Sequence, residues 1–425
     1  MHCPTADSLF LRANGDFTCW DDVGSDRILL PWKAGTDMAA VYAPGGPCDK
    51  AARRLAKKLL PHPSSCPGCI CLRPAGRWGF NPTTVDVMQV EPSVMCQLRC
   101  PACATPEERQ ARKPPRIMPR DVLEKILRDF RRAGVSIRSF DFSGHGEPLL
   151  NPQLPALIAL AREMQPGSFI ILRTNANGEP DPAILDDGTN QIHISIDGVD
   201  PESYAKYRAG GDFRRAWTFL DEMSRMARGR GSRTRIVWNY ILFEHNSEVD
   251  QLRRAWRMAQ ESGVHELRFV LTHIGMWSRT ITSGVELAKR LLDAEVPRRR
   301  IMVDTSRSLE ERTSWKEWLK RSDMAYRTAR RIWRYMARRS GNSRTVVTAD
   351  YCTVDRRRIR RFLSIGLSHL QRGDREAANG MLRHAEELVR RPGKHNPRFD
   401  PAEYLGHLEA PLNELAEGLG RGRTG

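Results

Sequence analysis

The chain has 425 residues, which is enough for two or three domains of roughly 150 residues each. Its hydrophobic share of 40% and charged share of 28% are typical of globular proteins. The sequence contains no run of about 18 apolar residues, the length that is needed to cross a bilayer. Arginine supplies much of the formal net charge of +17, mostly after residue 285, and we interpret these arginines as solvated helix faces rather than a nucleic-acid surface.

The first residues lack the basic start and long apolar stretch of a secretory signal, so we expect a cytoplasmic protein. Ten cysteines in that reducing compartment are not expected to form a disulfide framework. Three of them lie between residues 66 and 71 and three between 96 and 103. This clustering indicates metal ligation.

Residues 1–80 are predicted to form a separate, cysteine-rich module. They contain many turns, little helical pattern outside 49–60 and six cysteines, so a bound cluster would have to supply the missing core. Cys3 and Cys19 flank two short strand-like pieces around an Asn14-Gly15 turn, a hairpin signal that brings both thiols to one end. Further on, CPGCIC has a spacing that suits iron–sulfur or zinc ligation.

Residues 81–285 alternate short β-rich runs with amphipathic helical stretches. One such stretch has Val122, Leu123, Ile126, Leu127 and Phe130 on a single face and ends at Gly134. Six β-then-α units imply a parallel sheet with helices outside it, and therefore an open or partial α/β barrel. The predicted strands are 85–90, 139–143, 169–173, 191–195, 235–242 and 266–271.

Residues 286–425 are predicted to form a basic, mostly helical region. The segment 361–391 has the pattern of two helices joined near Gly373, similar to one tetratricopeptide-type unit. A single unit of that kind is weak evidence for a repeat, because such units need neighbours to be stable.

Cys96, Cys100 and Cys103 follow the first predicted barrel strand in the segment QVEPSVMCQLRCPAC. Three thiolates in so short a loop leave one iron of a four-iron cluster without a protein ligand, and an open iron can bind a substrate. A closed structural zinc site is the alternative, and it would need a fourth ligand. His145 is the nearby candidate for that ligand.

This loop resembles the signature of the radical SAM superfamily, and the resemblance implies a partial (β/α)6 barrel. The segment SGHGEPLL is similar to the family's motif for the amino group of S-adenosylmethionine, with His145 where glycine is more usual. LRTNANG resembles the family's Thr-Asn-Gly turn, and HISIDGVDPESYAKYRAGG carries polar positions that contact ribose or carboxylate in relatives. The cofactor-binding residues implied by this resemblance are Gly144, Gly146, Glu147, Thr174, Asn175, Ser195, Asp197 and Arg208.

Each of these motifs could by itself be an ordinary turn. Together they follow successive predicted strands in the expected order, at the strand ends where parallel α/β sheets bind ligands. The resemblance implies a [4Fe-4S] cluster on Cys96, Cys100 and Cys103 that reductively cleaves S-adenosylmethionine. The 5′-deoxyadenosyl radical then abstracts a substrate hydrogen, and a flavodoxin or ferredoxin is the expected electron donor.

The remaining cysteines resemble an auxiliary-cluster module of the SPASM or twitch type, placed here before the barrel instead of after it. The resemblance implies an auxiliary [4Fe-4S] cluster on Cys3, Cys19, Cys66 and Cys69. Structural zinc is the alternative, and Cys71 could replace Cys69. Cys48 and Cys352 are further ligands or buried thiols, the latter being the commoner case.

The sequence suggests three possible functions. The leading hypothesis is a radical SAM enzyme that acts on a small polar metabolite such as a sugar, a nucleoside or a natural-product intermediate. The second is a radical SAM maturase of a ribosomal peptide. The third is a zinc-bearing nucleic-acid-binding protein, suggested by the net charge and CPGCIC, but it leaves the ordered strand-end motifs unexplained.

Overall fold

The structure of the protein is a computed structural model. It describes residues 7–19, 28–57, 81–101, 103–104, 106–186, 188–271, 278, 280–281, 284–296, 301–304 and 346–351. The predicted ligands Cys3, Cys66, Cys69 and Cys71, together with Cys352 and the helical pair at 361–391, lie outside these residues. None of the helices within them is long and apolar enough to cross a bilayer.

The chain divides into two compact units. The first contains Met1–Ile196 and Asp200–Trp238, and the second contains Asp197–Val199 and Asn239–Gly425. Because β8 (Arg235–Leu242) runs past Trp238, its first half belongs to the first unit and its second half to the second.

The first unit is built on a mostly parallel sheet with the strand order β3-β2-β1-β4-β5-β6-β7. Pairing is parallel from β1 through β4, β5 and β6 to β7, and antiparallel between β1, β2 and β3. The strands are β1 (Ser8–Leu11), β2 (Phe17–Thr18), β3 (Ile28–Leu30), β4 (Thr84–Val90), β5 (Ser136–Phe142), β6 (Phe169–Thr174) and β7 (Gln191–Ser195). The α/β class with a mostly parallel sheet is therefore confirmed.

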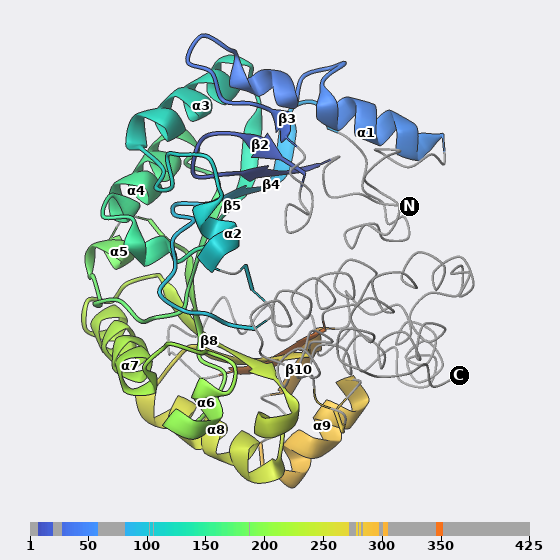
Figure 1. Cartoon of the computed structure of the whole chain (residues 1–425). Helices are drawn as coiled ribbons and strands as arrows, with labels where there is room; N and C mark the ends of the chain where they lie inside the picture. Colours follow the sequence, from blue (N-terminus) through green and yellow to red (C-terminus); the bar gives the residue numbers. More distant parts are fainter. Residues whose placement is uncertain are drawn as a thin grey trace, which may run out of the picture. The chain divides into compact units, whose positions relative to one another are not determined.

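Helices cover one face of this sheet, and Figure 1 shows α3, α4 and α5 side by side along it. The apolar face predicted from the sequence is buried, since α3 places Val122, Leu123, Ile126, Leu127 and Phe130 in the core. The helices of the unit are η2 (Met38–Val41), α1 (Pro47–Ala56), α2 (Pro106–Gln110), α3 (Arg120–Arg132), η3 (Pro148–Leu150), α4 (Leu154–Met164), α5 (Ala183–Asp186), α6 (Pro201–Ala205) and α7 (Phe213–Gly229).

The two faces of the sheet differ in chemistry because side chains alternate along each strand. The row Val90, Phe142, Leu172 and Ile192 is fully buried on one face. The opposite face carries a polar network, because Arg173 Nε donates to both carboxylate oxygens of Asp141 on β5, at 3.0 and 2.9 Å. Arg173 Nη1 lies 2.8 Å from His193 Nδ1 on β7. Since a guanidinium only donates, Nδ1 is the acceptor and the ring proton lies on Nε2.

The second unit contains the second half of β8, η4 (Glu244–Asn246), α8 (Val249–Ser262), β9 (Glu266–Leu271), α9 (Gly284–Asp293), β10 (Ile301–Asp304) and β11 (Val346–Tyr351). Its strand order is β10-β11-β9-β8, and β11 pairs in parallel with both β9 and β10. Helix α8 ends at Gly263, whose φ of 64° is left-handed and therefore suits glycine.

The structure confirms all six predicted strands between residues 84 and 271, to within three residues at each end. Two features differ from the expectation. Strand β1 pairs in parallel with β4, so the Asn14-Gly15 hairpin extends the edge of this sheet. In the region predicted to be mostly helical, the short β-branched runs IMVD and VVTADY form β10 and β11, because pairing with a neighbouring strand outweighs the helical character of the flanking sequence.

Candidate active site

The loop that carries Cys96, Cys100 and Cys103 leaves the sheet after β4 and is closed at its base by a short antiparallel contact. Ser93 and Ile117 form a β-bridge, Val94 N donates to Arg116 O at 2.9 Å, and Met118 N donates to Pro92 O at 2.9 Å.

Asn151, a buried residue that follows η3, reinforces this closure from the neighbouring strand connection. Its Nδ2 donates to the carbonyl oxygens of Pro92 and Met118, at 2.9 and 3.0 Å. One amide thus holds both ends of the loop, which we call the cysteine loop (residues 91–118).

The three cysteines are half-buried. Cys96 Sγ accepts hydrogen bonds from Leu98 N at 3.4 Å and from Asn175 Nδ2 at 3.6 Å. The orientation of the Asn175 amide is fixed, because its Oδ1 accepts the backbone N–H of Asn177 at 2.9 Å and Nδ2 must therefore face the sulfur. Donors directed at a cysteine sulfur are typical of iron–sulfur ligands, whose potentials they adjust. Burial raises the pKa of the Cys96 thiol, and the hydrogen bond from Leu98 opposes that shift.

Arg109 braces the cysteine loop from inside. Only 3% of it is exposed, and its guanidinium donates to Ala104 O at 2.6 Å and to Leu98 O at 2.8 Å. The two acceptors lie on either side of Cys100 and Cys103, so this one side chain sets the width of the loop.

The glycines of SGHGEPLL are required by close packing against the cysteine loop. A Cβ atom on Gly144 would lie 2.5 Å from Glu91 Cγ, and one on Gly146 would overlap the carbonyl oxygens of Ser93 and Met95. This packing also fixes the position of Glu147 relative to the cysteine loop, because Glu147 N donates to Met95 O at 2.7 Å.

Glu147 joins the ends of β5 and β6. It is 2% exposed, and its Oε1 accepts from Thr174 Oγ1 at 2.6 Å and from Leu149 N at 3.1 Å. Its Oε2 accepts from Asn175 N at 2.7 Å. Burial raises the pKa of this carboxyl, while its hydrogen bonds and the charge of Arg208 oppose the shift.

The turn after β6 departs from the Thr-Asn-Gly pattern in an informative way. Ala176 occupies the third position and adopts φ 61°, a left-handed conformation in which glycine is more usual. The turn is held by Asn177, whose Nδ2 donates to Asn175 O at 2.9 Å and to Tyr204 OH at 2.8 Å. Neighbouring hydrogen bonds therefore maintain a backbone geometry that an alanine would not choose alone.

The structure brings Cys96, Glu147, Thr174 and Asn175 into one hydrogen-bonded set, and Arg208 influences that set through its charge. Ser195 lies half-buried at the end of β7. Asp197 belongs to the second unit and is fully buried, and its carboxylate accepts the backbone N–H of Ile241 at 2.6 Å. The cofactor-contact roles assigned to Ser195, Asp197 and Arg208 stay predictions.

His145, the candidate fourth ligand of a zinc site, is engaged by both its side chain and its backbone. Arg112 Nη2 lies 3.1 Å from His145 Nδ1, which must therefore be the acceptor. The backbone N of His145 donates to Glu91 Oε1 at 2.8 Å, and its carbonyl oxygen lies 3.9 Å from Cys103 Sγ.

Of the four cysteines predicted to bind an auxiliary cluster, the described part of the chain includes only Cys19, which is 5% exposed after β2. Cys48, for which a further ligand and a buried thiol were the two alternatives, is fully buried in the first turn of α1. Within the described ranges, no three His, Cys, Asp or Glu side chains gather closely enough to hold one metal ion. The auxiliary cluster stays a prediction.

Glu91, Arg109 and Asn151 were not predicted from the sequence, although they hold the cysteine loop and the glycine segment together. Glu91 directly follows β4, and its carboxylate accepts backbone N–H groups from His145 and, at 3.4 Å, from Ala13. Burial raises the pKa of Glu91, and the nearby Arg112 and Arg12 oppose that shift. The position of Glu91 at the end of an apolar strand was the one available signal.

Comparison with known proteins agrees with this geometry. Residues 90–255 match the model of the Radical SAM superfamily. The chain is 27% identical over 143 residues to GTP 3′,8-cyclase of Chlorobaculum tepidum, which covers 33% of this chain and 41% of that protein. It is 31% identical over 161 residues to PqqA peptide cyclase of Xanthomonas axonopodis pv. citri, which covers 36% and 39%.

A solved structure of the histidine-tagged protein anSMEcpe with bound AdoMet is 20% identical, with a TM-score of 0.38, and the match covers 50% of this chain and 57% of that one. The chain spans about two fifths of the length of the two curated relatives named above. The cysteine loop, the glycine segment and the two following strand ends all lie inside the matched range. This chain therefore carries a domain of the Radical SAM superfamily.

Proposed function

We propose that the protein is a radical SAM enzyme that abstracts hydrogen from a small polar metabolite. Radical SAM proteins use a [4Fe-4S] cluster and S-adenosylmethionine, and when bound these supply a carbon-centred oxidant. The observation that carries the proposal is the chain of contacts from Cys96 Sγ through Asn175 to the buried carboxylate of Glu147. It joins the expected cluster ligands to the expected cofactor ligand.

The cysteine loop fits a four-iron cluster in its donor chemistry. Three half-buried thiols lie in a loop whose ends are pinned by Asn151 and whose width is set by Arg109. Cys96 already receives two N–H donors, which stabilise a thiolate. In this role Cys96, Cys100 and Cys103 would hold the iron, and the N–H groups of Leu98 and Asn175 would donate to the sulfur of Cys96.

Glu147 fits the ammonium of S-adenosylmethionine. A carboxylate offers about four lone-pair sites, and Leu149, Thr174 and Asn175 occupy three of them. One site is left for a further donor. Because burial disfavours an isolated negative charge, a cation placed here would be bound more strongly than at an exposed carboxylate.

The polar face of the sheet supports a polar substrate. Asp141, Arg173 and His193 form a linked set across β5, β6 and β7 on the face opposite the apolar row that contains Val90. Hydroxyl, amide or carboxylate groups of a small metabolite would find both donors and acceptors there. A hydrocarbon substrate would leave these groups partly desolvated without compensation.

A ribosomal-peptide maturase is the second candidate, and one observation favours it. The relative named PqqA peptide cyclase is 31% identical over 161 residues. A peptide substrate would use the same cysteine loop and Glu147, and would differ from a metabolite in requiring a longer binding surface. The zinc-bearing nucleic-acid alternative is set aside because the Radical SAM match includes every motif of the site.

The test is anaerobic reconstitution with iron and sulfide, reduction with dithionite, and chromatographic measurement of 5′-deoxyadenosine. The wild-type protein is expected to form 5′-deoxyadenosine from S-adenosylmethionine. The Cys96→Ala/Cys100→Ala/Cys103→Ala variant is expected to form none. Absence of the product from a wild-type sample that holds its iron would overturn the proposal.

A further inference from the structure

The side-chain amide of Asn175, in the turn after β6, is directed at a cysteine sulfur. Its Nδ2 donates to Cys96 Sγ at 3.6 Å, and its Oδ1 accepts from Asn177 N at 2.9 Å and from Gln97 Nε2 at 3.4 Å. Two donors on one oxygen fix the direction of the amide, because the reversed amide would place its NH₂ group against both of them. Only 6% of Asn175 is exposed, so the contact with the sulfur is largely shielded from bulk water.

Asn177 holds this turn with every polar atom of its side chain. Its Nδ2 donates to Asn175 O at 2.9 Å and to Tyr204 OH at 2.8 Å. Its Oδ1 accepts from Asp212 N at 2.6 Å. An amide nitrogen has two hydrogens, and these bonds use both of them, so Nδ2 has none left for a ligand. Asn177 therefore acts on the turn, and it reaches the sulfur only through Asn175.

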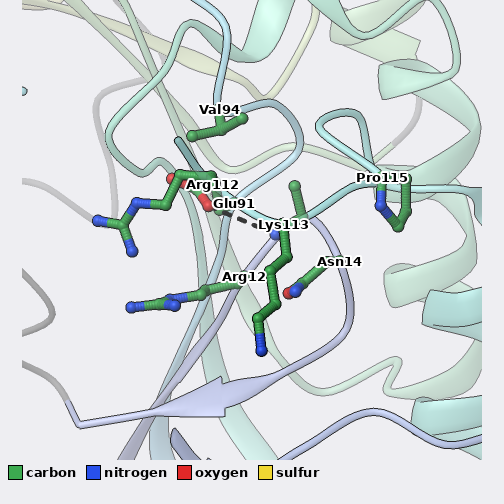
Figure 2. A pocket seen from close by; sticks show the side chains of 8 residues that line it. Arg12, Asn14, Glu91, Val94, Arg112, Lys113 and Pro115 are labelled. Carbon is green, nitrogen blue, oxygen red and sulfur yellow. Dashed lines mark hydrogen bonds between the residues drawn. The ribbon is translucent and has the colours of Figure 1, made fainter. Parts of the chain in front are cut away.

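The contacts of Asn175 differ from those of Glu91, the first residue of the cysteine loop. Figure 2 shows Glu91 near Arg112 of the same loop. The oxygens of Glu91 accept from His145 N at 2.8 Å and from Ala13 N at 3.4 Å, so this carboxylate holds backbone groups in place. Asn175 instead places a side-chain donor against a cysteine that is expected to bind iron. Its contact can therefore act on the chemistry of the sulfur as well as on the fold.

We infer that Asn175 raises the reduction potential of the cluster on Cys96, Cys100 and Cys103, and that Asn177 is the positioning residue that keeps Asn175 in place. A hydrogen bond to a thiolate stabilises the reduced state of a cluster, because that state carries the greater negative charge. Hydrogen bonds to the sulfurs are among the features that set the potentials of iron–sulfur clusters. The inference rests on the proposed function for the presence of the cluster, but not for cleavage of the cofactor.

The test is a redox titration of the reconstituted protein without S-adenosylmethionine, in which dithionite supplies the electron and electron paramagnetic resonance measures the reduced cluster. Asn175→Ser keeps a hydroxyl that can accept from Asn177 N but is too short to reach Cys96 Sγ. It should lower the equilibrium constant for one-electron reduction about threefold to tenfold, which is about 28–59 mV at 59 mV per tenfold change. Asn177→Ala should lower the potential by a smaller amount, because Asn175 keeps its donor but loses a bond that supports it.

The matched control is Asn190→Ala, which removes an amide that accepts from Ile170 N and from Arg162 Nη2, both at 2.7 Å. Asn190 contacts the start of β6, whereas Asn175 follows its end, so this variant should lose stability and keep the wild-type potential. An unchanged or raised potential in either test variant would overturn the inference, and so would an equal shift in Asn190→Ala. Asn177→Ala carries the test if Asn175→Ser does not retain its iron. Failure of the proposed function would instead appear as absent 5′-deoxyadenosine with the differences in potential intact.

Discussion

At the scale of single residues, the chemistry depends on a few buried polar groups that serve more than one partner. Glu147 receives three hydrogen bonds from two strand ends, and Asn175 faces Glu147 with its backbone and Cys96 with its side chain. A change in any one of these groups therefore disturbs both the thiol and the carboxylate. This coupling makes isosteric substitutions informative.

Glu147→Gln should weaken binding of S-adenosylmethionine by at least about tenfold. The amide removes the negative charge, and in either orientation its NH₂ faces a backbone N–H of Leu149 or Asn175. Equilibrium dialysis of the reconstituted variant with labelled cofactor measures the effect. Glu163→Gln on the exposed side of α4 is the control, and equal affinities for the two variants would contradict the role of Glu147.

Asp7 predicts a dependence of stability on pH. Burial, with a contribution from Asp86, raises its pKa from 3.8 to about 6. Between about pH 4 and pH 6 the folded protein holds a proton that the unfolded chain releases, so the contribution of Asp7 to stability falls as pH rises through this window. Asp7→Asn should therefore raise the free energy of unfolding by up to about 3 kcal/mol at pH 7 and by about half as much at pH 5.

Urea denaturation at the two pH values measures this difference. Asp121→Asn, on the exposed first turn of α3, should give no comparable gain. A stability change for Asp7→Asn that is independent of pH would show that the Asp7 carboxyl is already ionised when the protein is folded.

At the scale of elements, the site depends on how the cysteine loop packs against the segment after β5. Gly146 allows that packing, because a Cβ atom there would overlap backbone oxygens of Ser93 and Met95. Arg109 and Asn151 hold the loop by its own carbonyl groups. The loop is thus held through its backbone carbonyl groups, by two specific side chains and by a glycine that permits close contact.

Gly146→Ala should destabilise the protein by about 2–3 kcal/mol and reduce the iron that it retains. The backbone of the cysteine loop would have to move away to admit the methyl group. Gly167→Ala is the control, since a Cβ atom there meets nothing within 4 Å. Chemical denaturation and iron analysis of both variants measure the effect. Equal stability of the two variants would show that the backbone of the cysteine loop can move to admit the methyl group at little cost in free energy.

Arg109→Lys should speed the release of iron to a chelator, because one ammonium cannot reach both Leu98 O and Ala104 O in the geometry of the planar guanidinium. The circular dichroism spectrum of the Arg109→Lys variant should equal that of the wild type. This result would distinguish a loosened cysteine loop from a misfolded protein. Arg131→Lys on the exposed surface of α3 should release iron at the wild-type rate. Equal rates of iron release from the two variants would show that Arg109 does not hold the cysteine loop in place.

Periodicity and strand-end motifs were sufficient to predict the six strands from β4 to β9, because apolar runs between amphipathic helices are a local signal. The motif residues around Cys96 and Glu147 were instead implied by the resemblance to the radical SAM superfamily. Arg109 could not be predicted, because in an arginine-rich chain nothing local separates a buried arginine from an exposed one. For Glu91 the one local signal was its position directly after a strand. The strands β10 and β11 were missed because only the pairing of β11 with β9 and of β10 with β11 reveals them.

At the scale of the whole molecule, the family match extends across the boundary between the two units. Residues 90–255 include β4 to β7 of the first unit and end within α8 of the second. Among the residues that the structure describes, those that donate hydrogen bonds to Cys96 and Glu147 belong to the first unit. We therefore expect Cys96 and Glu147 to depend on the first unit for their polar contacts.

With three cysteines as ligands, one iron of a four-iron cluster would be open to S-adenosylmethionine. Electron paramagnetic resonance of the reduced protein, with and without S-adenosylmethionine, tests it most directly. Addition of the cofactor should change the spectrum of the wild type and should have no such effect in the Cys96→Ala/Cys100→Ala/Cys103→Ala variant. A wild-type spectrum that stays the same while the cofactor is bound would contradict it.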